Sequence, residues 1–271
     1  IDRLLHETRE IAKLVGDTDR IISLVPLHHI YGCIWGPLLS EALEVPLIHG
    51  NNARRVIHND LQSGDLVIGV PEWWRYIASS RTPLPQGVKG VTSTAPCPPD
   101  IFDQALGKGF ECILEVYGSS ETGGIGWRTD RHCGFKLFAH WQRLGDDHLQ
   151  TGNGDQFQLP DIVEWQSDTS LVPRSRRDGA VQVGGINVWP DRIRVFIETH
   201  PEVSECTVRP TQTTQGTRLK AFVVPENVEN ETFHKELSAW MVQNLSAAER
   251  PVSLTLGDQL PRNPMGKLCD W

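Results

Sequence analysis

Short apolar segments alternate with helical patterns over residues 21–117, and this alternation restricts the fold more than any other feature of the sequence. The apolar segments are IISLV (21–25), VPLI (45–48), LVIGV (66–70), VKGVTS (88–93) and CILEVY (112–117). Helical patterns lie between them, near residues 32–43, 53–62, 71–79 and 98–107. Strands that alternate with helices predict βαβ units, a mostly parallel sheet, and ligand sites at the carboxyl ends of its strands.

An amphipathic helix is predicted before this alternation, over residues 3–15. Its apolar residues near one face are Leu4, Leu5, Ile11, Leu14 and Val15. After residue 126 the helical pattern stops, and short strands with turns predict an antiparallel appendage up to residue 178. The remaining residues, 179–271, have their own pattern of strands and helices. We therefore expect a large α/β domain (1–178) followed by a small α+β domain (179–271).

Composition excludes several classes of protein. The net charge of −8 argues against nucleic acid or an anionic membrane surface as the main partner. No apolar run approaches the length of about 18–20 residues that a membrane span needs, and no secretory signal opens the sequence. The cysteines are scattered without a C-x-x-C pair: Cys33, Cys97, Cys112, Cys133, Cys206 and Cys269. Reduced thiols in a cytoplasmic protein are the expected reading.

The stretch VYGSSETGG (116–124) is the strongest candidate for a site. It follows an apolar strand and combines glycines, hydroxyl side chains and one carboxylate, Glu121. Such a turn at a strand end suits a phosphate with its divalent cation, because carboxylate oxygen is a ligand that Mg²⁺ prefers. The alternative is a carboxylate that only caps nearby backbone N–H groups of the turn.

Four stretches together make the chain similar to the adenylate-forming ligases, the family of acyl- and aryl-CoA synthetases, 4-coumarate–CoA ligase and firefly luciferase. These stretches are PLHHIYG (26–32), TSTAPC (92–97), VYGSSET (116–122) and the pair RRDGAVQVGGINVWP (176–190) with LPRNPMGK (260–267). They occur in the family's order across essentially the whole chain, which makes the set more specific than any single motif. The resemblance implies a shortened large adenylation domain joined to the family's small C-terminal domain.

The resemblance also implies ATP or AMP, Mg²⁺, and CoA or pantetheine as ligands. By this likeness Tyr117 stacks on adenine, Ser120 hydrogen-bonds the AMP phosphate, and Glu121 holds Mg²⁺. His29 borders the substrate carboxylate, although a histidine taken alone is more often a satisfied core residue. Lys267 neutralises charge on the carboxylate and α-phosphate, although a solvated lysine is the alternative.

Further residues follow from the same likeness. Asp161 lies fifteen residues before Arg176, the family's spacing for the aspartate that binds the ribose hydroxyls and its arginine partner. Gly184 and Gly185 let the backbone approach the pantetheine arm. Ser93 and Thr94 stand against the adenine in place of small glycine or alanine residues.

The sequence departs from the family in two more respects. The family's Thr/Ser/Gly-rich phosphate loop ending in Pro-Lys, expected just upstream of the helix at 3–15, is not in this sequence. Gln182 stands where these ligases usually carry a lysine. Removing phosphate-binding N–H groups and a charge lowers the stabilisation of the transition state.

Two functions remain open at this stage. The first is a degenerate ligase-like protein that no longer adenylates. It would stabilise or assemble carrier-protein or phosphopantetheinyl-transferase machinery in polyketide-type biosynthesis. This role is implied by a resemblance to ligase-like members of bacterial aromatic-polyketide clusters. An exposed large-domain edge would then be covered by a partner protein. The second is a working acyl- or aryl-CoA ligase whose missing third comes from an upstream segment or another chain.

Overall fold

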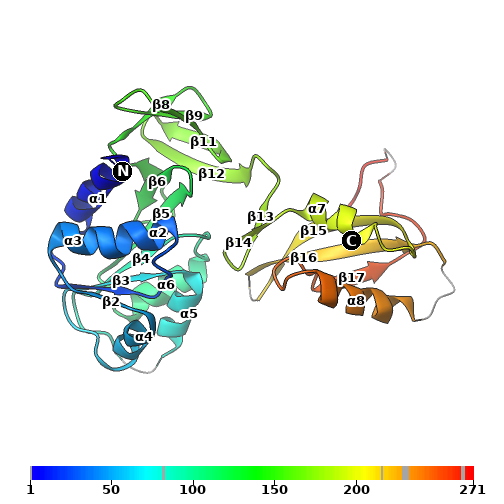
Figure 1. Ribbon diagram of the computed structural model, residues 1–271, viewed down its shortest axis with the longest axis horizontal. Coiled ribbons are helices and arrows are strands. Elements are labelled where there is room, and N and C mark those ends of the chain that lie inside the picture. The colour runs from blue at the N-terminus through cyan, green and yellow to red at the C-terminus, as the bar shows by residue number, and fades with distance from the viewer. Residues whose placement is uncertain (1, 81–82, 215, 228–231, 264–265) are drawn as a thin grey trace. The chain divides into compact units, whose positions relative to one another are not determined.

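The computed structural model describes residues 2–80, 83–214, 216–227, 232–263 and 266–271 (Figure 1). The chain divides into a larger unit, residues 1–175, and a smaller unit, residues 176–271. In the described part of the chain, no helix combines the length and apolar character that a membrane span requires.

Parallel strands form one half of the main sheet of the larger unit. They are β1 (Arg20–Ser23), β2 (Leu47–His49), β3 (Asp65–Gly69), β4 (Lys89–Thr92) and β5 (Cys112–Ser119). Among the described residues the sheet has nine strands in the order β11-β12-β7-β6-β5-β4-β3-β1-β2. Because β1 to β5 run parallel, their carboxyl ends meet at one edge, where family ligands are expected. The expected α/β fold class is confirmed.

Antiparallel strands continue the same sheet, so the segment after residue 126 is largely an extension of it and not a separate appendage. These strands are β6 (Gly123–Arg128), β7 (Phe135–Leu137), β11 (Asp161–Ser167) and β12 (Ser170–Arg176). The extension begins because β5 turns tightly and pairs antiparallel with β6. A separate three-stranded sheet follows the order β10-β9-β8, formed by β8 (Trp141–Leu144), β9 (His148–Thr151) and β10 (Gln156–Gln158).

Helices join successive parallel strands and cover both faces of the sheet. They are α1 (Asp2–Val15), α2 (Ile30–Cys33), η1 (Ile34–Leu38), α3 (Leu39–Leu43), α4 (Gly50–Asn59), α5 (Pro71–Ser79) and α6 (Pro99–Lys108). Alternate residues of a strand belong to the two cores, as with Ile21 in one and Ile22 in the other. The predicted helix near 32–43 contains a π-helical stretch at Pro37, which cannot donate the usual backbone hydrogen bond.

Helix α1 is present, and its predicted apolar face packs against the core, with Leu5 as the exception. Ile11 is fully buried, while the side of Leu5 faces solvent and leaves that residue 40% exposed. The polar residues Glu7 and Thr8 are buried on this helix as well. Helical periodicity alone did not predict a carboxyl group inside this packing.

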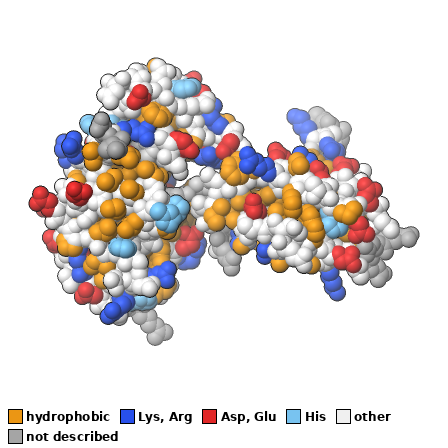
Figure 2. Space-filling view, in the orientation of Figure 1, with side chains coloured by type: hydrophobic (Ala, Val, Ile, Leu, Met, Phe, Trp, Pro, Cys, Tyr) orange, Lys and Arg blue, Asp and Glu red, His pale blue; other side chains and the backbone are white. Residues whose placement is uncertain are grey.

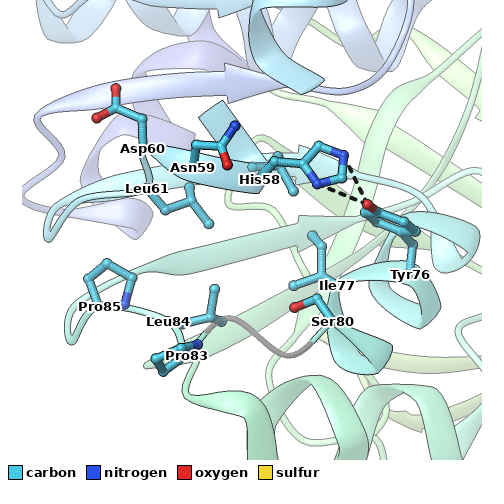
Figure 3. A pocket seen from close by; sticks show the side chains of 11 residues that line it. His58, Asn59, Asp60, Leu61, Tyr76, Ile77, Ser80, Pro83, Leu84 and Pro85 are labelled. Atoms are coloured by element: carbon cyan, nitrogen blue, oxygen red, sulfur yellow. Dashed lines mark hydrogen bonds between the residues drawn. The ribbon is translucent and has the colours of Figure 1, made fainter. Parts of the chain in front are cut away.

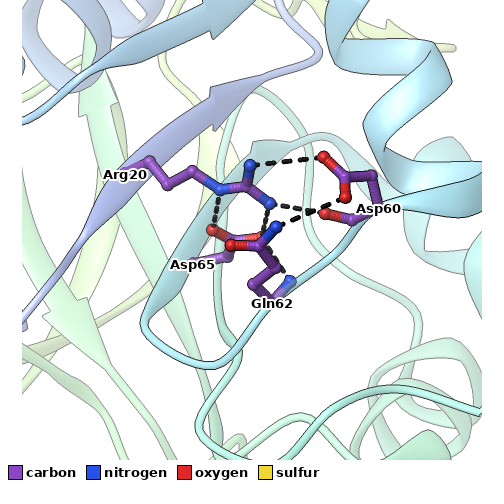
Figure 4. A network of polar contacts seen from close by, with 4 residues as sticks. All are labelled: Arg20, Asp60, Gln62 and Asp65. Atoms are coloured by element: carbon purple, nitrogen blue, oxygen red, sulfur yellow. Dashed lines mark hydrogen bonds and ion pairs between the residues drawn. The ribbon is translucent and has the colours of Figure 1, made fainter.

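An ion pair fixes β1 against β3 at the end of the sheet opposite the carboxyl edge (Figure 4). Arg20 Nε donates to Asp65 Oδ1 at 2.6 Å and Nη2 donates to Oδ2 at 3.0 Å. The Gln62 backbone N–H donates to the same carboxylate at 2.8 Å. The side chain of Asp65 is fully buried, so these donors compensate for its lost hydration.

The smaller unit is an α+β domain. Its elements are β13 (Val181–Val183), β14 (Ile186–Val188), α7 (Pro190–Ile197), β15 (Val203–Thr213), β16 (Gly216–Pro225), α8 (Phe233–Asn244) and β17 (Ser253–Leu256). The sheet order is β15-β16-β17, and residues such as Ile193, Val208 and Leu237 share one core.

Candidate functional site

The candidate residues of the larger unit follow the carboxyl ends of the parallel strands. Ser93 and Thr94 come after β4, and residues 117–122 form the end of β5 and its turn. The Ser93 hydroxyl donates to the Val116 carbonyl at 2.9 Å, so the ends of β4 and β5 are tied together. His29 follows β1 and precedes α2 at the same edge.

Tyr117 and Asp161 are brought together although 44 residues separate them. The Tyr117 hydroxyl donates to Asp161 Oδ2 at 2.5 Å. Asp161 is buried at the start of β11, and the Tyr117 ring lies 5.6 Å from the Phe135 ring. A carboxylate beside an aromatic ring fits a nucleoside, because carboxylate oxygens accept from ribose hydroxyls and the ring stacks on a base.

The turn after Tyr117 is held by its own hydroxyl groups. Thr122 Oγ1 accepts the Ser119 backbone N–H at 3.1 Å, and Ser119 Oγ accepts the N–H groups of Glu121 and Thr122 at 3.3 and 3.2 Å. Ser120 and Glu121 are exposed, so their side chains remain on the surface of the turn. The hydroxyl and carboxylate predicted to meet the phosphate and Mg²⁺ are therefore both accessible.

The donor set fits Mg²⁺ only together with other oxygens. Among the described residues no group of three or more His, Cys, Asp or Glu side chains is arranged to hold a metal ion. Mg²⁺ commonly binds through one or two carboxylates plus phosphate oxygens and water. Glu121 would supply the protein carboxylate in such a site.

Helix α1 is hydrogen-bonded to this turn through Arg3 and Glu7, which the sequence motifs did not select. Arg3 Nη2 donates to the Glu121 carbonyl at 2.8 Å, and the Gly124 N–H donates to Glu7 Oε1 at 2.8 Å. Glu7 is fully buried, and burial raises the pKa of its carboxyl group to about 7 despite the Gly124 hydrogen bond. Only the long-range pairing of α1 with the turn could have revealed these contacts.

The two glycines after the turn make this anchor possible. A Cβ at Gly123 would lie 2.5 Å from Glu7 Oε2, and one at Gly124 would lie 2.6 Å from Oε1. Gly123 also has a φ of +67°, a conformation that glycine adopts without steric cost. The Gly-Gly pair of the motif is thus required by packing against α1.

Thr94 adopts a left-handed backbone conformation, with φ of +74°. This is uncommon for a β-branched residue, and backbone strain of this kind concentrates at functional sites. Thr94 is exposed, at the position where the family resemblance places a small residue beside adenine.

His29 is exposed, and its ring centroid lies 4.5 Å from that of His28. No hydrogen bond within the described residues joins it to Tyr117 or Asp161. The nearby Tyr31, which the sequence analysis did not select, is buried, and its hydroxyl lies 2.9 Å from the Val91 carbonyl. Burial raises the pKa of this hydroxyl well above its ordinary value, so it remains a neutral donor that fixes α2 at the carboxyl edge.

Arg176, Gly184 and Gly185 belong to the smaller unit. Arg176 donates to both carboxylate oxygens of Asp178, at 3.1 and 3.0 Å, and this pairing lowers the pKa of Asp178 to about 2. The glycines are the two central residues of the β13–β14 hairpin, with φ of +57° and +80°. Two positive φ angles are typical of a type I′ turn, which explains the Gly-Gly pair locally.

Lys267 has an exposed side chain on a fixed backbone. Its N–H donates to Asn263 Oδ1 at 2.9 Å, and its carbonyl accepts the Asn263 N–H at 2.8 Å. Within the described residues its ammonium group makes no ion pair. Residues 264–265 of the same motif lie outside the described part.

A small pocket between α4 and α5 is not part of this site (Figure 3). It has a volume of about 100 Å³, and the Tyr76 hydroxyl lies 2.9 Å from His58 Nε2 beside it. Its walls come from the carboxyl-terminal ends of α4 and α5, which lead into β3 and β4 at their amino ends. The pocket is therefore at the opposite edge of the sheet from Tyr117.

Comparison with known proteins matches both units. Residues 3–147 match the model of the AMP-binding enzyme family, and residues 195–267 match the AMP-binding enzyme C-terminal domain. The chain is 34% identical to the 4-coumarate–CoA ligase of Halorhodospira halophila, over 98% of this chain and 69% of that protein. It is also 34% identical to the 4-coumarate–CoA ligase of Cereibacter sphaeroides, over 99% of this chain and 65% of that protein.

Solved structures show the same fold. One is the o-succinylbenzoate CoA synthetase of Bacillus subtilis, with a TM-score of 0.77, 18% identity, and coverage of 98% of this chain and 64% of that chain. Another is the amide bond synthetase of Marinactinospora thermotolerans, with a TM-score of 0.76 and 16% identity; the match covers 98% of this chain and 63% of that chain. The chain spans about two-thirds of the length of these ligases and synthetases. It belongs to the AMP-binding enzyme family, the adenylate-forming ligases.

Proposed function

We propose that this chain takes part in forming a CoA thioester from an aromatic carboxylic acid through an acyl-adenylate. The observation that carries the proposal is the Tyr117–Asp161 pair, with its 2.5 Å hydrogen bond at the carboxyl edge of the sheet. The 34% identity with two 4-coumarate–CoA ligases over nearly the whole chain supports an aryl acid as the substrate.

The larger unit would bind the AMP half of the adenylate. The hydrogen bond to Asp161 fixes the orientation of the Tyr117 ring, so its face can stack on adenine without a loss of rotamer entropy on binding. The buried Asp161 carboxylate would accept from the ribose hydroxyls, and the exposed Ser120 hydroxyl would donate to the phosphate. Arg176 is assigned to the ribose by its place in the family motif.

Adenylation joins a substrate carboxylate oxygen to the α-phosphorus of ATP and breaks the bond to pyrophosphate. Glu121 would hold Mg²⁺ beside these phosphates, and Lys267 would stabilise the negative charge that develops on the transferred group. The CoA sulfur then bonds to the acyl carbon, and AMP leaves. His29, exposed before α2, would border the reacting carboxylate.

A second candidate is a protein that binds nucleotide but does not adenylate, and serves a partner such as a carrier protein or a phosphopantetheinyl transferase. Two residues favour it: Gln182 is uncharged where these ligases usually carry a lysine, and Thr94, in a left-handed conformation, would crowd adenine. Apolar side chains gathered on the visible face of the larger unit also support a protein partner (Figure 2).

Two measurements on the 271-residue chain test these proposals. Calorimetry should show saturable AMP binding that Asp161→Asn weakens, while Asp17→Asn, an exposed carboxylate on the loop after α1, leaves it unchanged. Absence of AMP binding at millimolar concentration would contradict both candidates.

The second measurement separates the candidates. Exchange of labelled pyrophosphate into ATP that depends on 4-coumarate, and that Lys267→Ala abolishes, would support the ligase. The matched control is Lys235→Ala, since Lys235 is exposed on α8 and makes no ion pair among the described residues. AMP binding without any exchange would support the non-adenylating protein.

A further inference from the structure

Lys267, to which the proposed function assigns charge stabilisation, lies on a short loop of the smaller unit. Arg262 pairs with Leu268 in an isolated antiparallel bridge, and Arg262 Nη1 donates to the Gly266 carbonyl at 3.0 Å. These bonds are local, and a two-stranded pairing of this kind is only marginally stable by itself in water. The position of the Lys267 side chain therefore depends on what holds the ends of this loop.

The residues after Lys267 are tied to the sheet of the smaller unit, and we call residues 268–271 the Trp271 segment. Arg209 Nη2, from β15, donates to the Leu268 carbonyl at 3.0 Å. Lys220 Nζ, from β16, donates to the Trp271 carbonyl at 2.7 Å. The segment is thus hydrogen-bonded to the sheet at its first and its last residue.

The half-buried Trp271 ring packs against the same two strands. Its centroid lies 4.5 Å from Lys220 Nζ and 5.7 Å from the guanidinium carbon of Arg209. The Phe222 ring meets it edge to face, with 5.7 Å between the ring centroids. Cations near an indole face and an edge-to-face aromatic pair both stabilise this placement of the ring.

Arg209 and Lys220 lie directly opposite each other on β15 and β16. Their neighbours Val208 and Leu219 face the core, so the two cations share the other face of the sheet. Like charges that face each other across a strand pair are destabilising, and the Lys220 side chain is only 12% exposed. Asp270, on the Trp271 segment, places Oδ1 2.6 Å from Lys220 Nζ and offsets this repulsion.

We propose that Trp271 and Lys220 are positioning residues for Lys267. They hold the Trp271 segment on the sheet, and the segment holds the loop so that the Lys267 ammonium reaches few positions. A charge fixed in advance stabilises a developing anion without reorganisation, whereas a mobile lysine loses side-chain and backbone entropy when it engages. The inference rests on the proposed role of Lys267 in adenylation.

Amide hydrogen exchange of the 271-residue chain, resolved by residue, tests the attachment without any ligand. The Lys267 N–H donates to Asn263 Oδ1 at 2.9 Å, and the Cys269 N–H donates to the Pro261 carbonyl at 2.8 Å. Both amides exchange only when the loop opens, so their rates report how firmly the loop is held.

Two variants release the segment in different ways. Trp271→Ala removes the ring, and Lys220→Met removes the donor to the Trp271 carbonyl; each should speed exchange at Lys267 about tenfold or more. The amides of β15 and β16 should exchange no faster, and Lys235→Met, at an exposed lysine of α8, should change nothing. Unchanged exchange at Lys267 in both variants would overturn the proposal. Faster exchange throughout β15 and β16 in Trp271→Ala would indicate general unfolding, and Lys220→Met would then decide.

Exchange of pyrophosphate into ATP that depends on 4-coumarate tests the consequence for Lys267. Trp271→Ala should lower the turnover rate about tenfold and leave the KM for ATP within about twofold, because the interaction lost belongs to the transition state. Trp271→Phe keeps an aromatic face beside Lys220 and should restore most of the rate. Full turnover in Trp271→Ala despite faster amide exchange would overturn the positioning role.

The two measurements also separate this inference from the proposed function. An unmodified chain that shows no pyrophosphate exchange would contradict the ligase function. The amide rates at Lys267 would still decide whether the Trp271 segment holds the loop.

Discussion

Replacing Thr94 by glycine should stabilise the larger unit by about 1 kcal/mol. A left-handed conformation costs an L-residue about 1–2 kcal/mol, and Thr94 holds a φ of +74° with a β-branched side chain. Glycine removes this strain. It also raises the entropy of the unfolded chain, which lowers the free energy of unfolding by about 0.5–1 kcal/mol and offsets part of the gain. The threonine side chain is exposed and makes no hydrogen bond within the described residues, so its removal costs little.

Urea unfolding of the chain, followed by a probe in the larger unit, measures this change. A gain of about 1 kcal/mol corresponds to a rise of about 2–4 °C in the melting temperature of a unit of this size. Thr94→Ala is the matched control: it keeps Cβ, so it should recover less than half of the gain. Glycine and alanine variants of equal stability would refute the reasoning, since strain at φ would then not be the cause.

The same substitution bears on the nucleotide. If Thr94 crowds adenine, Thr94→Gly should tighten AMP binding as well as stabilise the fold. A stabilised variant with unchanged AMP affinity would leave the strain argument intact and contradict the crowding of adenine.

Three further predictions concern charged and hydroxyl groups. Between pH 4.5 and about 7 folded Glu7 holds a proton that the unfolded chain has released, so stability should fall by up to about 3 kcal/mol as pH rises through this window. Glu7→Gln should flatten that fall, whereas Glu41→Gln, an exposed control, should not. Asp65→Ala should lower the free energy of unfolding by about 3 kcal/mol, measured in urea. This is the low end of the range for a broken buried ion pair, because Arg20 keeps its contacts with Asp60. Tyr117→Phe should cost about 2 kcal/mol of stability while it preserves base stacking, so AMP affinity should fall less than in Asp161→Asn.

Local pattern predicted the elements well where a single factor decides them. The predicted helix at 71–79 is observed with the same ends, because Pro71 begins it and the apolar residues Trp74 and Ile77 face the core. Strand β5 was expected to end at residue 117 but continues to Ser119, because antiparallel pairing with β6 extends it. That pairing depends on a turn whose conformation propensity alone does not reveal.

Sequence reasoning selected chain positions for the candidate site, but it did not predict the contacts between them. Family spacing selected Tyr117 and Asp161 separately, and neither periodicity nor spacing indicated that one would hydrogen-bond the other. The burial of Glu7 was even harder to predict from the sequence. A helical pattern places charged residues on the solvent side, but the Glu7 carboxyl group is buried and accepts the Gly124 N–H. The Glu7 contact depends on how α1 packs against the turn, which no local pattern records.

The way the turn is held leads to a last prediction about the predicted phosphate and Mg²⁺ ligands. Its conformation depends on the hydroxyls of Ser119 and Thr122 and on backbone contacts with α1. Within the described residues, Glu121 contributes only its backbone N–H and carbonyl to these contacts, and the side chains of Ser120 and Glu121 are exposed.

Ser120→Ala and Glu121→Gln should therefore each leave the free energy of unfolding within about 0.5 kcal/mol of the original value. Ser119→Ala, which removes two accepted N–H bonds, should destabilise the unit by about 1–2 kcal/mol and serves as the structural comparison. Calorimetry should then show weaker AMP binding for Ser120→Ala and a lost dependence of ATP binding on Mg²⁺ for Glu121→Gln. If Glu121→Gln instead lost stability and kept its Mg²⁺ dependence, the carboxylate would be a structural part of the turn and not a metal ligand.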